Sequence, residues 1–346
     1  PGDPYSRTLH FRSLNNLTGF SMYRYIRSEF REDSVQGRLN TFIFMTPMKR
    51  NAVSAELNSV IKTTNYVGPG INLSWRNRNV FHGAEMLSLN LTGNFEVQVG
   101  MDSINTSYEL GLDAGLEIPR IVPFKIRNIA PEFLPLTQIK IGTSLYRRVE
   151  LYTLNSFYVQ FGYRWRQSAW LNHVLRVADL SYSNLSNQST AFREYLETNP
   201  ILKRSFEEQF IFGTAYSLIH DQLSHPSATQ YYLGGALETS GNMLSLVSGT
   251  PQDGGGSSDE FLGVPYSQFF KFRGEYRHYY RIGRNDKLAA RTILGIGIPY
   301  GNSDIIPYVR QFFAGGTNSV RAFVSRSIGP GSYTPPVENI GVNRTG

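Results

Sequence analysis

From about residue 51 onward, apolar and polar side chains alternate along the chain in unusually long runs. Successive side chains of a β-strand point to opposite faces, so each run gives one apolar and one polar face. The clearest runs cover residues 87–99, 108–118, 157–166 and 266–282. Strands of a soluble sandwich average about 5–6 residues, whereas a tilted strand that crosses a bilayer needs roughly 9–11. Run length therefore favours membrane-crossing strands over a soluble β-sandwich.

Turn residues divide this region into about eleven predicted strands. They span residues 52–64, 68–77, 85–100, 106–119, 137–153, 156–167, 172–183, 207–219, 229–240, 266–282 and 287–298. Unpaired backbone amides at a sheet edge are costly in lipid, and bacterial single-chain barrels usually have an even number of strands. We therefore predict an all-β fold, a transmembrane antiparallel β-barrel that is incomplete here. Its closing strands are expected beyond Gly346 or from another chain.

Three segments depart from the alternating pattern. The first fifty residues predict a helix at 5–17, a strand at 20–30, a turn at Gln36 and Gly37, and a strand at 39–45. Helix, strand, strand is half of a small α+β module, which implies further sequence before Pro1. Within the barrel region, residues 192–206 are predicted to be helical and residues 252–260 to form a flexible loop tip.

Composition narrows the class of protein further. No stretch approaches the roughly 18 uninterrupted apolar residues of a membrane-spanning helix, so a helical membrane protein is excluded. Aromatic residues make up 13% of the chain and glycines number 32, which suits interfacial girdles and tight turns. There is no cysteine, which excludes disulfides and thiolate metal sites in these residues. The net charge is +7, but its basic residues are scattered through strands, so no nucleic-acid partner is expected.

Enzyme chemistry finds little support. No nucleophile elbow, phosphate-binding glycine loop or His-Glu-x-x-His motif is present. His220, Asp221 and His225 are interpreted as a polar turn, not a metal site. Glu109, Asp113 and Glu117 recur every fourth residue on one strand face and are expected to pair with lumen Arg and Lys side chains. We expect no catalysis, no cofactor and no metal.

The segment from Pro307 to Pro330 resembles the sixth extracellular loop of the BamA/TamA outer-membrane protein family. The tip of that loop carries a Val/Leu-Arg-Gly-Phe/Tyr motif, flanked by glycines. The matching residues here are Gly315, Gly316, Val320, Arg321, Ala322, Phe323, Gly329 and Pro330. The resemblance implies that the loop folds back into the lumen and that Arg321 docks on the inner wall. A guanidinium suits that role because it is always charged and offers five donors.

Two further resemblances support the family. Residues 75–85 resemble its turn between the second and third barrel strands. The residues that carry this likeness are Asn77, Arg78, Asn79, Phe81 and Gly83, of which the asparagines and the glycine are expected to tolerate positive φ. Residues 1–50 resemble the C-terminal part of the last POTRA domain, a periplasmic repeat. The barrel then covers 51–346, about eleven of an expected sixteen strands, and breaks off within the sixth loop.

Ala322 departs from the family's glycine and, with Gly-Pro-Gly-Ser-Tyr at 329–333, is closest to TamL, the TamA-like lipoprotein of Gram-negative Bacteroidota. The family implies assembly or translocation of proteins into or across the bacterial outer membrane, without ATP or cofactor. Implied partners are outer-membrane lipids and lipopolysaccharide, unfolded outer-membrane proteins, and a TamB-like periplasm-spanning protein or BAM-type lipoproteins.

The first barrel strand is expected to form one side of a weakly paired lateral seam, where substrate strands add to an exposed edge. Its lipid-facing residues are Val53, Ala55, Leu57, Ser59 and Ile61. Three alternatives stay open. The chain is a BamA-type insertase core of the BAM complex, a passive outer-membrane channel, or a structural scaffold.

Overall fold

A computed structural model describes residues 4–33, 38–61, 66–99, 105–124, 132–198, 203, 206, 208–224, 227–248, 260–261, 263–316 and 319–323. The elements are α1 (Arg7–Gly19), β1 (Tyr23–Asp33), β2 (Arg38–Pro47), β3 (Asn51–Ile61), β4 (Tyr66–Asn77), β5 (Met86–Gln98), β6 (Thr106–Ile118), β7 (Leu136–Arg148), β8 (Tyr152–Arg166), β9 (Leu171–Ser186), α2 (Thr190–Thr198), β10 (Gln209–Asp221), β11 (Thr229–Ser240), α4 (Asn242–Ser248), β12 (Glu260–Phe261), β13 (Val264–Pro265), β14 (Phe269–Arg281), β15 (Lys287–Pro299) and η1 (Tyr308–Arg310). Within these residues, no helix is long and apolar enough to cross a membrane.

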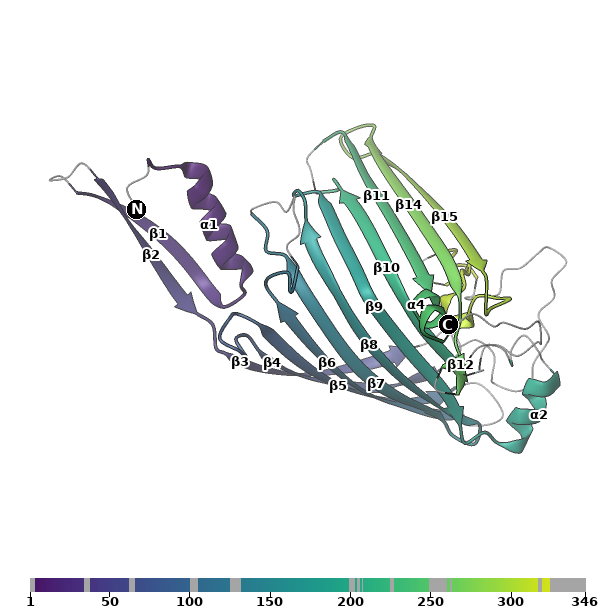
Figure 1. Cartoon of the computed structure of the whole chain (residues 1–346). Helices are drawn as coiled ribbons and strands as arrows, with labels where there is room; N and C mark the ends of the chain where they lie inside the picture. Colours follow the sequence, from purple (N-terminus) through teal and green to yellow (C-terminus); the bar gives the residue numbers. More distant parts are fainter. Residues whose placement is uncertain are drawn as a thin grey trace.

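One antiparallel sheet of eleven strands dominates the molecule (Figure 1). Each strand pairs with the next barrel strand along the chain, from β3 to β11 and then through β14 to β15. The register is regular over long stretches; β14 pairs with β15 from Phe269 opposite Pro299 to Arg281 opposite Lys287. The predicted antiparallel β architecture and the count of eleven strands are confirmed. The two edges of the sheet are β3 and β15.

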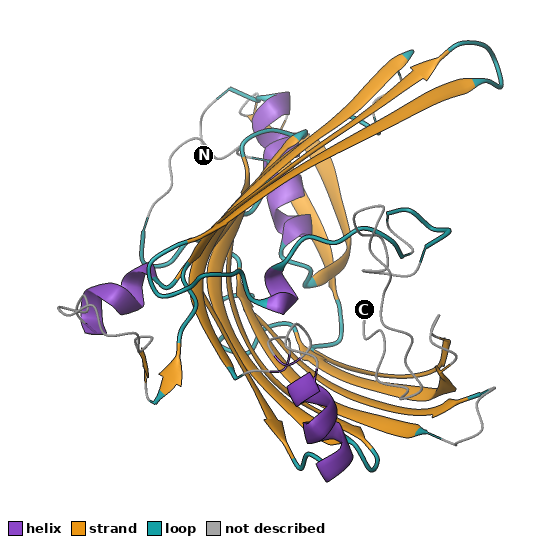
Figure 2. Ribbon diagram, turned by 90° about the vertical axis from the view of Figure 1, so that its right-hand side faces the viewer, coloured by secondary structure: helices purple, strands orange, loops and turns teal. Residues whose placement is uncertain are grey.

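The sheet is curved (Figure 2), and its two faces differ in chemistry. The polar side chains lie on the concave face. There, Arg148 on β7 donates to the Tyr66 hydroxyl on β4 at 2.5 Å, across the two intervening strands β5 and β6. The side chains on the opposite face are apolar and exposed. For example, Leu294 and Ile298 on β15 have 57% and 52% of their surface accessible. Apolar side chains left outward on many strands mark a surface that is covered in use.

The N-terminal residues form a separate helix and hairpin. Helix α1 begins after Ser6, whose hydroxyl accepts from the backbone N–H of Leu9, as expected of an N-cap residue. Strands β1 and β2 pair antiparallel, and His10 of the helix hydrogen-bonds Ser28 of β1 at 3.0 Å. This confirms the predicted helix, strand, strand order. The predicted turn at Gln36 and Gly37 lies outside the described residues, and the POTRA assignment stays a prediction.

One predicted boundary is wrong. The turn between β7 and β8 lies at residues 149–151, not at 154–155, and Glu150 adopts φ 64° there. No Gly, Pro or Asn marks that turn, so the apolar pattern was extended through it. Helix α2 covers the first part of the predicted helical segment 192–206 and buries Phe192 and Leu196 against Tyr152, and residues 203 and 206 are helical as well. Most of the predicted loop tip, residues 252–259, lies outside the described residues.

Candidate functional site on the concave face

The chain that follows β15 turns back and packs against the polar face of the last strands. Phe312 lies against Gly295, where a Cβ would come within 2.9 Å of its ring, and Ile306 lies against Gly297, where a Cβ would come within 2.4 Å. The Lys271 ammonium sits 4.4 Å from the Phe312 ring centroid, a cation–π contact. The two glycines of β15 therefore leave the space that the returning loop occupies.

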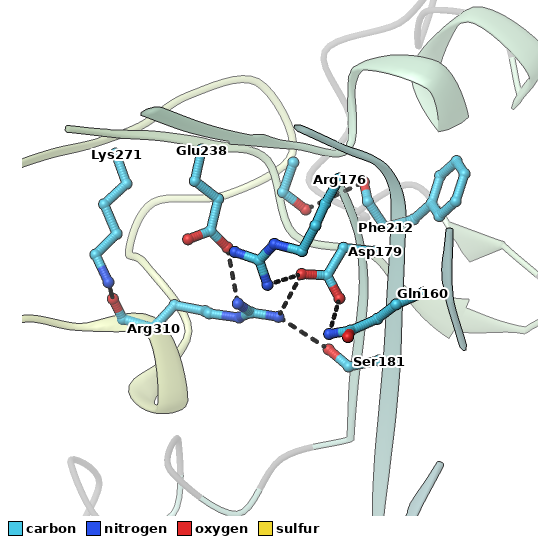
Figure 3. A network of polar contacts seen from close by, with 9 residues as sticks. Gln160, Arg176, Asp179, Ser181, Phe212, Glu238, Lys271 and Arg310 are labelled. Carbon is cyan, nitrogen blue, oxygen red and sulfur yellow. Dashed lines mark hydrogen bonds and ion pairs between the residues drawn. The ribbon is translucent and has the colours of Figure 1, made fainter. Parts of the chain in front are cut away.

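Arg310 is the charged anchor of this loop (Figure 3). Its guanidinium lies 3.0 Å from the Glu238 carboxylate and 3.8 Å from the Asp179 carboxylate, and it donates to Ser181 at 3.5 Å. The backbone carbonyl of Arg310 accepts from the Lys271 ammonium at 2.5 Å. With the Arg310 side chain only 20% exposed, these contacts are well shielded from solvent. One residue thus joins the loop to β9, β11 and β14.

Asp179, one of the two receiving carboxylates, also has partners on the sheet itself. Asp179 is 5% exposed, accepts from Arg176 at 2.7 Å and accepts from the Gln160 amide at 3.1 Å. Glu238 lies two strands away, and the β10 residues in register with the two acids are Gly213 and Ala215. Small side chains between the two carboxylates leave room for a guanidinium to reach both.

The predicted motif at the loop tip lies beyond the segment that Arg310 anchors. Gly315 and Gly316 adopt φ 95° and 84°, and the N–H of Gly316 donates to the Phe323 carbonyl at 2.7 Å, closing a tight turn. Val320, Arg321, Ala322 and Phe323 are exposed. Arg310, which no motif singled out, forms ion pairs that join the loop to the sheet wall. Docking of Arg321 stays a prediction, and Gly329 and Pro330 lie outside the described residues.

The predicted turn motif at 77–83 does connect β4 to β5, but its backbone differs from the expectation. Positive φ occurs at His82 (69°) and Ala84 (63°), not at the asparagines or Gly83. A Cβ at Gly83 would come within 2.3 Å of the Glu85 carboxylate, which accepts from the Gly83 N–H at 2.8 Å. The Asn79 side chain accepts from the Ala84 N–H at 2.9 Å. Phe81 is 67% exposed. Glycine is thus needed at 83 for space, and the asparagines act through their side chains.

The same turn holds the junction between the N-terminal module and the sheet. Arg78 donates its side chain to the Lys49 carbonyl at 3.0 Å and its backbone N–H to the Arg50 carbonyl at 2.9 Å. The Asn77 amide donates to the Asn51 side chain at 2.9 Å, and Arg50 donates to the Asn77 oxygen at 3.4 Å. The family turn motif is therefore a structural tie between the two parts of the chain.

The predicted seam residues lie together on one edge. Val53, Leu57 and Ile61 are 76%, 85% and 78% exposed, and Ala55 and Ser59 are exposed too. Within the described residues β3 pairs only with β4, so its other edge has no strand beside it. The role of these residues in a lateral seam stays a prediction.

Two expectations about polar side chains are wrong. Glu109, Asp113 and Glu117 accept hydrogen bonds from the neutral side chains of Asn94, Tyr158 and Gln138, not from Arg or Lys. Asn94 and Gln138 lie opposite Glu109 and Glu117 on neighbouring strands, and Tyr158 reaches Asp113 across Gly142 of β7. His220 is not in a turn: it lies within β10, its ring stacks on Tyr231 at 5.3 Å, and Asp221 ends the strand. His225 lies outside the described residues. No group of metal-binding side chains occurs in the described part of the chain.

Comparison with known proteins finds a family and a solved structure that match this chain. A family model described as the Omp85 superfamily domain matches residues 70–343. Among solved structures, BamA from Haemophilus ducreyi lacking POTRA domains 1–3 matches with a TM-score of 0.58 and 12% identity. The match covers 92% of this chain and 54% of that one, so this chain spans about half its length. No curated protein matches the sequence significantly.

Proposed function

This chain belongs to the Omp85 superfamily, and on that premise we propose that it forms the barrel of a bacterial outer-membrane protein that assembles or translocates other proteins. The observation that carries the proposal is the family match over residues 70–343; within the described residues, β3 lies at an edge of the sheet and exposes its apolar side chains. An incoming strand gains main-chain hydrogen bonds at such an edge. No nucleotide is needed, because pairing and apolar burial supply the free energy.

The docked loop contributes rigidity. Arg310 ties the loop to strands β9 and β11, far from β3 in the sheet order. A wall braced in this way stays closed while the edge at β3 opens. In this proposal, only the strands at the seam move, and the docked loop continues to fill part of the lumen.

Finer assignments follow the family resemblance. We propose a TamA-like role, closest to TamL, with the N-terminal module in the periplasm and a TamB-like protein as partner; Ala322 in the loop motif supports this choice. A BamA-type insertase with accessory lipoproteins is the nearest competitor. Recovery of one or the other partner with the affinity-purified full-length protein separates the two.

Cross-linking tests the seam. Ala55→Cys places a thiol on the edge strand, and Ala114→Cys places one on the same apolar face of the interior strand β6. An outer-membrane substrate with a single cysteine in its terminal strand should form a disulfide with the first variant and not with the second. Equal cross-linking of both, or of neither, would contradict assembly at this edge.

A passive channel is the alternative from another class. It predicts large and steady conductance in planar bilayers, whereas a lumen with a docked loop predicts small and intermittent conductance. Large, steady conductance that Arg310→Ala leaves unchanged would favour the channel.

A further inference from the structure

Charge is segregated on the concave face of the sheet. In the register of the sheet, every second residue of each strand lies on the concave face. This set includes the residues that contact the docked loop and the residues paired with them on neighbouring strands. On β3 to β6 the charged members are Glu56, Arg76, Glu96, Glu109, Asp113 and Glu117, and on β14 and β15 they are Lys271, Arg273, Glu275, Arg277, Arg281, Lys287 and Arg291. The wall formed by the first strands is acidic and the wall formed by the last two is basic.

Three arginines converge on one carboxylate in the middle of the basic wall. Glu275 accepts from Arg277 at 2.7 Å, from Arg291 at 2.8 Å and from Arg273 at 2.9 Å. Its side chain is 6% exposed, while those of the arginines are 33%, 40% and 48% exposed. We call Arg273, Arg277 and Arg291 the arginine triad.

The triad carries more positive charge than its centre can neutralise. Glu275 offsets only one of the two positive charges of Arg273 and Arg277, and Arg277 and Arg291 face each other directly in the register of β14 and β15. Like charges opposite each other on neighbouring strands destabilise a sheet. The Arg277 guanidinium carbon also lies over the Tyr232 ring, 4.8 Å from its centroid, a cation–π contact that removes no charge. The excess charge faces the interior of the curved sheet.

The position of the triad decides which anion fits. Glu275 is the middle residue of β14, so the triad lies far from both ends of the strand, where lipid headgroups reside. The acyl chains contact the other face of the sheet. Although Arg273 and Arg277 are four residues apart, their guanidiniums converge on Glu275, so the triad presents one compact cationic centre to an incoming carboxylate.

We propose that the arginine triad binds acidic side chains of an extended polypeptide that passes along the concave face. Glu275 acts as the resident counter-ion that an incoming carboxylate supplements. This site is distinct from the edge at β3, so it adds a second contact for a transiting chain. The triad selects for negatively charged side chains, whereas strand pairing at the β3 edge depends on main-chain hydrogen bonds alone.

The test uses the full-length protein in detergent micelles and a fluorescent peptide of about eight residues with Glu at alternate positions. Binding is followed by anisotropy at low and high salt. The double variant Arg273→Gln with Arg277→Gln should weaken binding about tenfold, as expected for loss of about 1.4 kcal/mol of charge interaction. Glu275→Gln removes the resident anion and should tighten binding. The matched control is Arg164→Gln with Arg166→Gln on the same face of β8, which should leave binding unchanged.

Opposite effects of the Arg and Glu substitutions distinguish a binding site from a merely structural cluster. Equal weakening by the control pair would show diffuse attraction and overturn the site. Full displacement of the peptide by millimolar inorganic phosphate would show a simple anion site and overturn the polypeptide assignment. If Glu275→Gln does not fold, the double Arg variant and its control still decide the question. Loss of peptide binding with intact cross-linking at Ala55→Cys separates this site from the proposed seam.

Discussion

Arg310→Ala should free the returning loop from the sheet. Removing one partner of a buried ion pair costs about 3–5 kcal/mol, because a charge is left without compensation. Here the cost is smaller. Asp179 keeps Arg176 and Gln160, and Glu238 keeps electrostatic contact with Lys271. We expect about 2 kcal/mol, which raises the population of the undocked loop about 30-fold.

Hydrogen exchange measures this population, since amides exchange from the open state. Exchange of peptides that cover residues 306–316 should accelerate about 30-fold in Arg310→Ala, with strand β6 unchanged as an internal reference. Val309→Ala is the matched control: its side chain is 62% exposed, so exchange should change by no more than about twofold. The reasoning fails if Arg310→Ala exchanges like the wild type, or if Arg321→Ala has the larger effect, as the family motif alone predicts.

Three further predictions concern packing, the turn and pH. Gly295→Val should displace Phe312 and accelerate exchange in the same loop peptides, whereas Gly235→Val, where a Cβ would have no neighbour within 4 Å, should not. Gly83→Ala should destabilise the turn by about 1–3 kcal/mol through the clash with Glu85, seen as a lower urea midpoint; an unchanged midpoint would refute the close packing. Burial of Glu85 opposes its ionisation, but hydrogen bonds from backbone N–H groups and Arg120 prevail and lower its pKa. The stabilisation is therefore present above the ordinary pKa of a glutamate and is lost as pH falls through the folded-state value. Between about pH 5 and pH 3 the wild type should lose more unfolding free energy than Glu85→Gln; parallel curves would contradict this.

The strands could be predicted because the alternation of side chains is local. β11 begins and ends at the predicted residues 229 and 240, and most other strands differ from their predictions by a few residues. The β7–β8 turn was misplaced because Glu150 takes up positive φ with no turn residue beside it. Tertiary context decides that conformation, not local propensity.

The loop anchor could not be found in the sequence. Arg310 meets Ser181, which is 129 positions away, and Glu238 on another strand, so the pairing depends on the register of the whole sheet. The family motif directed attention to Arg321 instead. The sequence does contain one signal for this anchor: Arg310 follows a strand that carries glycines at 295 and 297 on its polar face. The role of Gly83 was also missed, because its neighbour Glu85 matters more than its own φ.

Accessibility scanning along β5 tests the central claim, that one face of each strand contacts acyl chains and the other an enclosed aqueous interior. The chain has no cysteine, so nitroxide labels can be attached one at a time at Leu87, Ser88, Leu89, Asn90 and Leu91 in protein reconstituted into lipid vesicles. Collision with oxygen should be high at the three leucine positions, and collision with a water-soluble nickel chelate should be high at Ser88 and Asn90. Equal exposure of all five labels to the nickel chelate would contradict the membrane barrel and the assembly function proposed for it.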